Sequence, residues 1–95
     1  MDIQRKKIAV IGLGYIGLPT AAMIASEHIS VLGVDINPHI VALINEGRIH
    51  ITEPFLAEKV HEVVKQGYLR AKTDVEPADV FLITVPTPFL SLIHI

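Results

Sequence analysis

Short apolar stretches along the chain alternate between two patterns, one typical of buried strands and one typical of helices. Three stretches are rich in β-branched residues and predict strands over Ile8–Ile11, Ser30–Asp35 and Val80–Val85, with a shorter candidate over Leu69–Thr73. Continuous apolar strands of this kind are typical of parallel sheets that are buried on both faces. The pattern therefore favours a parallel sheet.

Three helices are predicted between these strands from apolar stripes and from proline and glycine at their ends. They cover Tyr15–Glu27, the segment from Pro38, capped by Asn37, to Gly47, and the segment from Pro54 to Gly67. Strands and helices alternating with short connections indicate right-handed parallel β-α-β units. We expect an α/β fold with a Rossmann-like parallel sheet, helices on both faces, truncated to about four strands in the order 3-2-1-4.

Gly12-Leu13-Gly14-Tyr15-Ile16-Gly17 fits the pattern G-x-G-x-x-G between the first strand and the first helix. Gly12 permits a tight turn, Gly14 lets a diphosphate approach the backbone, and Gly17 lets the helix lie against the strand. The free N–H groups at the start of the helix would stabilise the diphosphate. Taken alone, the motif is equally compatible with a glycine turn that merely joins a strand to a helix.

Asp35 ends the second strand at about the distance from the glycines where a carboxylate can accept the ribose hydroxyls of an adenosine. A carboxylate there repels a 2′-phosphate, so the position favours NAD over NADP. The alternative is a turn acid ahead of Asn37 and Pro38.

Val85-Pro86-Thr87-Pro88 lies at the carboxyl end of the last strand, where the ligand crevice of such a sheet opens. The prolines hold Val85 and Thr87 in extended geometry, so the segment could present fixed groups to the nicotinamide half of the cofactor. A plain strand terminator explains the spacing equally well.

Composition narrows the function classes. The 95 residues carry eight Lys and Arg against ten Asp and Glu, a net charge of −2 without a basic stripe, so nucleic acid is not an expected partner. The longest apolar run, Ile8–Leu18, falls short of the roughly 18 residues of a membrane span, and we expect no membrane partner. Arg5-Lys6-Lys7 before this run also resembles a signal peptide, a reading that the glycine spacing disfavours.

No residue type points to a metal or to catalysis within the chain. Cysteine is absent, which excludes thiolate ligands and cysteine nucleophiles and is compatible with the reducing cytoplasm, where we expect the protein to reside. The histidines show no ligand spacing, so we expect no metal site.

Four segments together resemble the amino-terminal NAD domain of the UDP-glucose/GDP-mannose dehydrogenase family. They are Ile11–Thr20, Gly33–Asn37, Ile49–Pro54 and Val85–Phe89. The resemblance implies that Tyr15, Ile16, Asp35 and Thr87 contact NAD. It further implies a homo-oligomeric parent enzyme that oxidises the C6 hydroxyl of a UDP-sugar to a carboxylate in two NAD-dependent steps, through a cysteine-bound intermediate.

The catalytic cysteine and the sugar-binding domain come later in family members, so the chain by itself is expected to be inactive. Two other functions remain open: a non-catalytic NAD-sensing module of the same fold, and a Rossmann dehydrogenase of a small hydroxy acid. The segment Val85–Pro88 disfavours the first, and the Leu-Pro-Thr continuation at Leu18–Thr20 disfavours the second.

The end of the chain departs from the family pattern after Phe89. Leu-Ser-Leu-Ile-His-Ile at residues 90–95 is also the translation of CTG TCT CTT ATA CAC ATC, a transposase adaptor used in sequencing libraries. We therefore expect residues 1–89 to be the first half of an NAD-binding domain and residues 90–95 to be an adaptor-derived scar. A genuine terminal strand is the alternative.

Overall fold

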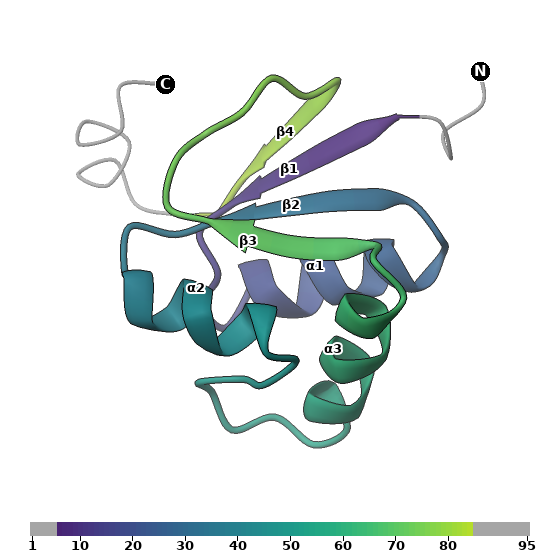
Figure 1. Cartoon of the computed structure of the whole chain (residues 1–95), viewed down its shortest axis with the longest axis vertical. Helices are drawn as coiled ribbons and strands as arrows, with labels where there is room; N and C mark the ends of the chain where they lie inside the picture. The colour runs from purple at the N-terminus through teal and green to yellow at the C-terminus, as the bar shows by residue number, and fades with distance from the viewer. Residues whose placement is uncertain (1–5, 85–95) are drawn as a thin grey trace.

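A four-stranded parallel sheet organises the molecule. The computed structural model describes residues 6–84. Its strands are β1 (Lys7–Ile11), β2 (Ser30–Val34), β3 (Leu69–Lys72) and β4 (Val80–Ile83). They lie in the order β3-β2-β1-β4, and every pair is parallel (Figure 1). This arrangement confirms the parallel sheet and the strand order predicted from the sequence.

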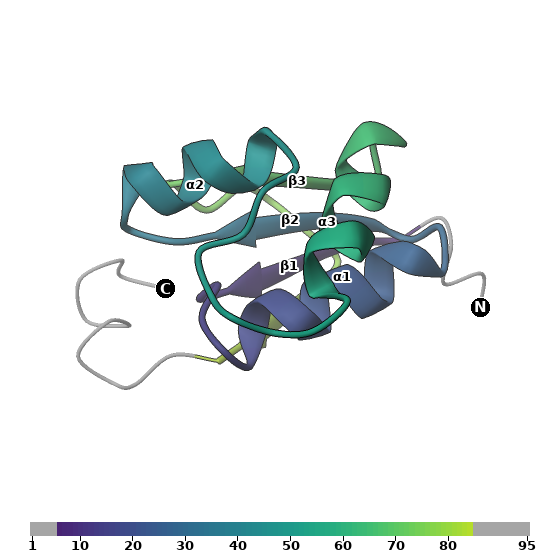
Figure 2. The ribbon, with the colours of Figure 1, turned by 90° about the horizontal axis from the view of Figure 1, so that it is seen from below.

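Three helices connect the first three strands and form one layer. They are α1 (Gly17–Ser26), α2 (Pro38–Asn45) and α3 (Leu56–Lys65). Figure 2 shows all three in front of the same face of the sheet. Apart from Gly17, the buried residues of all three helices belong to a single apolar core with the side chains that β1, β2 and β3 direct to that face.

The other face of the sheet carries no helix among the described residues, whereas the sequence pattern predicted helices on both faces. The reason is the connection between β3 and β4: residues 73–79 cross the sheet as an extended segment (Figure 1). We call residues 73–79 the crossover. Ala78 of the crossover packs against a small second core on this face, formed by Ala9, Ile11, Leu32 and Val34.

Small side chains bring α1 close to the sheet. Ala21, Ala22 and Ala25 are fully buried between the helix and the strands. Because alanine adds little thickness to the helix surface, the helix axis can lie near the backbone of β1 and β2. The first turn of α1 is thereby fixed above the carboxyl end of β1.

The ends of α2 follow the sequence signals closely. The side chain of Asn37 caps the helix by accepting a hydrogen bond from the amide of His39 at 2.9 Å, and Pro38 occupies the first helical position. Gly47 follows the helix with φ +78°. The side chain of Asn45 also bonds the amide and carbonyl of Ala71 at 2.8 and 2.9 Å, which satisfies the backbone of this residue in β3.

Three boundaries differ from the sequence prediction by two residues, and several others differ by one. Tyr15 and Ile16 form a turn, so α1 begins only at Gly17. The helix predicted to open at Pro54 begins at Leu56, preceded by Phe55 in left-handed geometry with φ +69°. The last strand ends at Ile83, and its predicted end at Val85 lies outside the described residues. Within residues 6–84, no helix combines the length and apolarity needed to cross a membrane.

Candidate functional site

Three segments that are far apart in the sequence meet at the carboxyl ends of the strands. The turn of residues 12–16 follows β1, Asp35 follows β2, and Thr84 follows β4. All four strands run toward this side of the sheet (Figure 1). In an open parallel sheet, ligands bind beyond the carboxyl ends of the strands, at the point where the order reverses. The order β3-β2-β1-β4 places that point between β1 and β4.

The glycines have three different environments. Gly12 adopts φ +98°, a conformation that other residues rarely take, and its amide donates to the carbonyl of Val34 at 2.7 Å. A Cβ at Gly17 would lie 1.7 Å from the carbonyl oxygen of Gly12, so the start of α1 touches the turn directly. A Cβ at Gly14 would meet no atom within 4 Å. Gly12 and Gly17 therefore play the backbone roles predicted from the sequence, while Gly14 borders open space.

The start of α1 is the positive end of a helix without a side-chain cap. Its N-cap residue, Ile16, makes no capping bond through its side chain, and the first turn holds no acidic residue. Tyr15 and Ile16 are 70% and 69% exposed. Among the described residues, the backbone amides of Tyr15, Ile16 and Gly17 have no backbone partner. Free amides and the helix dipole here favour a bound anion such as a diphosphate.

Asp35 ties the end of β2 to the glycine turn. One carboxylate oxygen, Oδ2, accepts the amide of Leu13 at 3.0 Å, and the other, Oδ1, accepts the amide of Asn37 at 3.0 Å. The bond to Asn37 is the turn interaction that the sequence left open as an alternative. Each carboxylate oxygen has a second lone pair, so these bonds leave acceptor capacity for ribose hydroxyls. Contact of Asp35 with a ribose stays a prediction.

Thr84 is a site residue that the sequence analysis did not single out. Its hydroxyl Oγ1 lies 3.0 Å from the carbonyl oxygens of both Ile11 and Gly12, a three-centre arrangement, and its amide donates to Ile11 at 2.9 Å. Thr84 thus joins the end of β4 to the glycine turn. A polar residue directly after an apolar strand, next to Val85-Pro86, was the signal for it. Thr87, which was predicted to contact NAD, lies outside the described residues.

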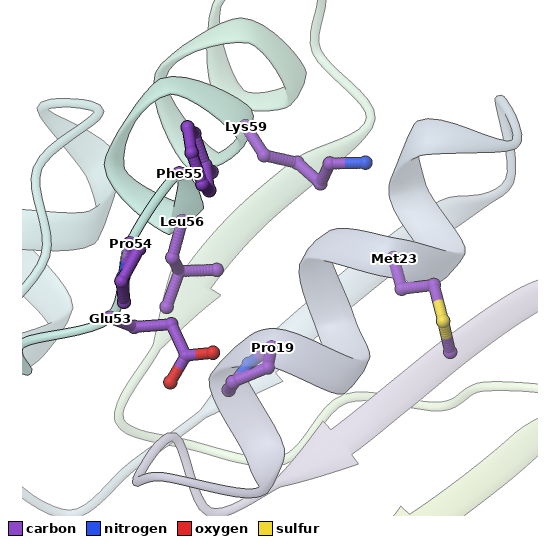
Figure 3. A pocket seen from close by; sticks show the side chains of 7 residues that line it. All are labelled: Pro19, Met23, Glu53, Pro54, Phe55, Leu56 and Lys59. Atoms are coloured by element: carbon purple, nitrogen blue, oxygen red, sulfur yellow. The ribbon is translucent and has the colours of Figure 1, made fainter.

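An open groove of about 280 Å³ lies elsewhere, between α1 and α3 (Figure 3). Its lining contains none of the residues predicted to bind NAD. The residues that line it are Pro19, Met23, Glu53, Pro54, Phe55, Leu56 and Lys59. The groove is therefore separate from the glycine turn.

The residues at the strand ends fit a dinucleotide. The open space beside Gly14 gives a diphosphate access to the backbone, the uncapped helix supplies N–H donors, and Asp35 supplies an acceptor one strand away. Together with the sheet order, these features define a dinucleotide-binding domain of the Rossmann class.

The chain belongs to the UDP-glucose/GDP-mannose dehydrogenase family, because the sequence model of that family's NAD-binding domain matches residues 6–93. It is 62% identical over 90 residues to an NDP-N-acetyl-D-galactosaminuronic acid dehydrogenase from Ralstonia nicotianae, covering 95% of this chain and 21% of the relative. It is 63% identical over 86 residues to a UDP-N-acetyl-D-mannosamine dehydrogenase from Campylobacter jejuni, covering 90% of this chain and 21% of the relative.

A solved structure shows the same fold. The UDP-N-acetyl-mannosamine dehydrogenase of Staphylococcus aureus superposes with a TM-score of 0.81 at 49% identity, covering 84% of this chain and 19% of that one. The chain therefore spans about a fifth of the length of these relatives. The resemblance to the family inferred from the sequence motifs, and NAD as the cofactor of this domain, are confirmed.

Proposed function

We propose that this chain is the NAD-binding part of a nucleotide-sugar 6-dehydrogenase, and that the full-length protein oxidises UDP-N-acetyl-D-mannosamine to UDP-N-acetyl-D-mannosaminuronate for bacterial surface polysaccharide synthesis. The observation that carries the proposal is the junction of the glycine turn with Asp35 and Thr84, found in a chain of this family. Relatives that are named for this sugar and are 61–63% identical to the chain support the choice of substrate.

The residues of the chain would hold the cofactor in three places. The backbone of Gly14 would approach the diphosphate in the turn that Gly12 and Gly17 shape, with amides of Tyr15 and Ile16 as donors. Asp35 would accept the ribose hydroxyls of the adenosine half. Thr87 would contact the nicotinamide half from the segment that follows Thr84. When bound, NAD supplies a hydride acceptor for the oxidation of the sugar alcohol.

The role of this chain would be to bind and orient NAD, and the residues that perform the covalent chemistry of the family would lie outside this chain. It contains no cysteine, so it cannot form the thiol-bound intermediate that the family resemblance implies. We therefore propose that the chain by itself is inactive. We also propose that the full-length protein is a cytoplasmic homo-oligomer that uses a UDP-sugar. Light scattering on the purified protein would test its oligomeric state.

Several sugars are candidates for the substrate of the full-length protein. The Ralstonia relative is named for an N-acetyl-galactosaminuronic acid, so a galacto-configured substrate is a second candidate. UDP-N-acetylglucosamine and UDP-glucose are further alternatives, and a non-catalytic NAD-sensing module is the alternative without turnover.

The test is an assay of the full-length protein, expressed from the recovered reading frame, with NAD and each UDP-sugar in turn. We expect formation of two NADH per sugar with UDP-N-acetyl-D-mannosamine and a much lower kcat/KM with UDP-glucose. Preference for another sugar would overturn the substrate assignment. NAD binding without turnover of any sugar would favour the sensing module.

A further inference from the structure

Glu76, in the middle of the crossover, is bound by three cations from two strands. Its Oε1 accepts Lys7 Nζ at 2.6 Å and an Arg70 guanidinium nitrogen at 2.6 Å. Its Oε2 accepts Lys72 Nζ at 2.6 Å and the other terminal Arg70 nitrogen at 3.3 Å. Lys7 begins β1, whereas Arg70 and Lys72 lie on β3. One carboxylate thus connects the crossover to the strands on both sides of β2.

The cluster is well suited to hold the crossover in place. The Glu76 side chain is only 23% exposed, and Arg70 meets it through two nitrogens, the geometry of a strong charge-assisted pair. The bonds from Arg70, then Lys7 and Lys72, hold the pKa of Glu76 well below its usual range. The carboxylate is therefore ionised at physiological pH, and the crossover is attached by charge as well as by the apolar contact of Ala78.

β4, which follows the crossover, has little of its own to define its position. It is a four-residue edge strand in which Val80, Phe81 and Ile83 are 37%, 40% and 46% exposed. Of its four residues only Leu82 is partly buried, where it packs against the main core, so the strand specifies its register weakly. A slip of one residue would turn every side chain to the opposite face. The pairing Ile8↔Val80 through Ile11↔Ile83 must therefore be fixed at the ends of the strand.

Both ends of β4 are held by specific bonds. At its start, the amide of Lys7 donates to Asp79 Oδ2 at 2.7 Å, and the amide of Asp79 donates to the carbonyl of Lys7 at 2.8 Å. Lys7 is also the residue whose ammonium reaches Glu76. At the far end, Thr84 joins β4 to the carbonyls of Ile11 and Gly12. A register slip of β4 would move Thr84 away from the glycine turn.

We propose that Glu76 is a positioning residue of the nucleotide site: by binding Lys7, Arg70 and Lys72 it fixes the crossover, and through it the register of β4 that brings the Thr84 hydroxyl to the glycine turn. The inference rests on the proposed function of that turn as the NAD site. Glu76 itself lies in the crossover and contacts no residue assigned to the cofactor.

The test compares Glu76→Gln with Glu46→Gln in the full-length protein. Glu46 forms an exposed ion pair with Arg48 at 3.5 Å, so its substitution removes the same charge at an exposed position outside the crossover. We expect Glu76→Gln to raise the Kd and KM for NAD about tenfold. This increase corresponds to a fall of the fraction of molecules with the correct β4 register to about a tenth, because only these molecules bind NAD tightly. The KM for the sugar and the Glu46→Gln variant should stay near wild type.

The sign of this effect separates positioning from long-range electrostatics. NAD is an anion, so removing a negative charge would by itself tighten binding, and weaker binding has the opposite sign. Hydrogen exchange supplies the structural readout. The Thr84 amide, bound to Ile11, should exchange faster in Glu76→Gln, while the Gly12 amide, bound to Val34 on the other side of β1, should keep its protection.

If Glu76→Gln fails to fold, Lys72→Met takes its place in the test. This variant removes only one of the three cations that bind Glu76, so it should also weaken NAD binding, by a smaller factor. Unchanged NAD affinity in a folded Glu76→Gln protein, or equal loss of protection at Thr84 and Gly12, would overturn the inference. A wild-type protein that does not bind NAD would instead overturn the proposed function.

Discussion

Gly14 and Gly17 are three residues apart in one motif, yet substitutions at the two positions should have opposite consequences. A Cβ at Gly17 would lie 1.7 Å from the carbonyl oxygen of Gly12 and 2.6 Å from Thr84 Oγ1, where carbon atoms essentially never come closer than 3.0 Å. In Gly17→Ala, α1 must move away by roughly 1.3 Å, because the backbone oxygen of Gly12 cannot rotate away. We expect the substitution to lower the free energy of unfolding by about 3 kcal/mol, the upper end of the usual cost of overpacking.

At Gly14 the structure offers room. A Cβ there meets nothing within 4 Å, so Gly14→Val should leave the free energy of unfolding within about 1 kcal/mol of wild type. The branched side chain would instead fill the space through which the diphosphate reaches the backbone. Losing one or two charge-assisted N–H bonds of about 1.5–3 kcal/mol each corresponds to a decrease in NAD affinity of roughly a hundredfold.

The assay pairs thermal unfolding of the 95-residue chain, followed by circular dichroism, with NAD titration of the full-length protein carrying the same substitutions. Gly17→Ala should lower the midpoint of unfolding by more than about 10 °C, whereas Gly14→Val should hardly move it. Gly14→Val should weaken NAD binding by roughly a hundredfold. An NAD affinity of Gly14→Val close to that of the wild type would refute the role assigned to the glycine turn, and an unchanged midpoint for Gly17→Ala would refute the packing described for α1.

The remaining predictions concern Asp35, the isolated chain and acid. Asp35→Ala should weaken NAD binding at least tenfold in a titration, and because the carboxylate also accepts two backbone amides, it should destabilise the chain by about 1–3 kcal/mol in a urea melt. Residues 1–95 alone should produce no NADH with any UDP-sugar, since the chain lacks cysteine; turnover would exclude the thiol mechanism. Because the pKa of Glu76 is lowered in the folded state, the stability that it contributes should be complete above its ordinary value of 4.5 and lost as pH falls further. The difference in melting temperature between wild type and Glu76→Gln should therefore be constant from pH 7 to about pH 5 and shrink below that.

The parts of the fold that depend on local signals could be predicted from the sequence. Asn37, Pro38 and Gly47 define α2 through capping, fixed φ and left-handed geometry, which act within a few residues and can be read from spacing. The strands were visible because β-branched runs suit a buried parallel sheet. The strand order followed from the rules for β-α-β connections and matches the structure.

The features that the sequence did not predict depend on contacts between distant residues. Among residues 6–84 one face of the sheet carries no helix because of the course of the crossover, which Glu76 attaches to Lys7, 69 positions away. Thr84 reaches the carbonyl of Gly12 across 72 positions, and a single threonine after a strand does not reveal such a partner. Asp35 illustrates a mixed case, because the structure shows its turn bond to Asn37 and its bond to Leu13 in the same side chain.

Calorimetric titration of the full-length protein with NAD and with NADP tests most directly whether the glycine turn and Asp35 form the cofactor site. The account predicts saturable binding of NAD and at least tenfold weaker binding of NADP, because the Asp35 carboxylate at the end of β2 repels a 2′-phosphate. Equal affinity for the two cofactors, or no binding of NAD, would contradict it.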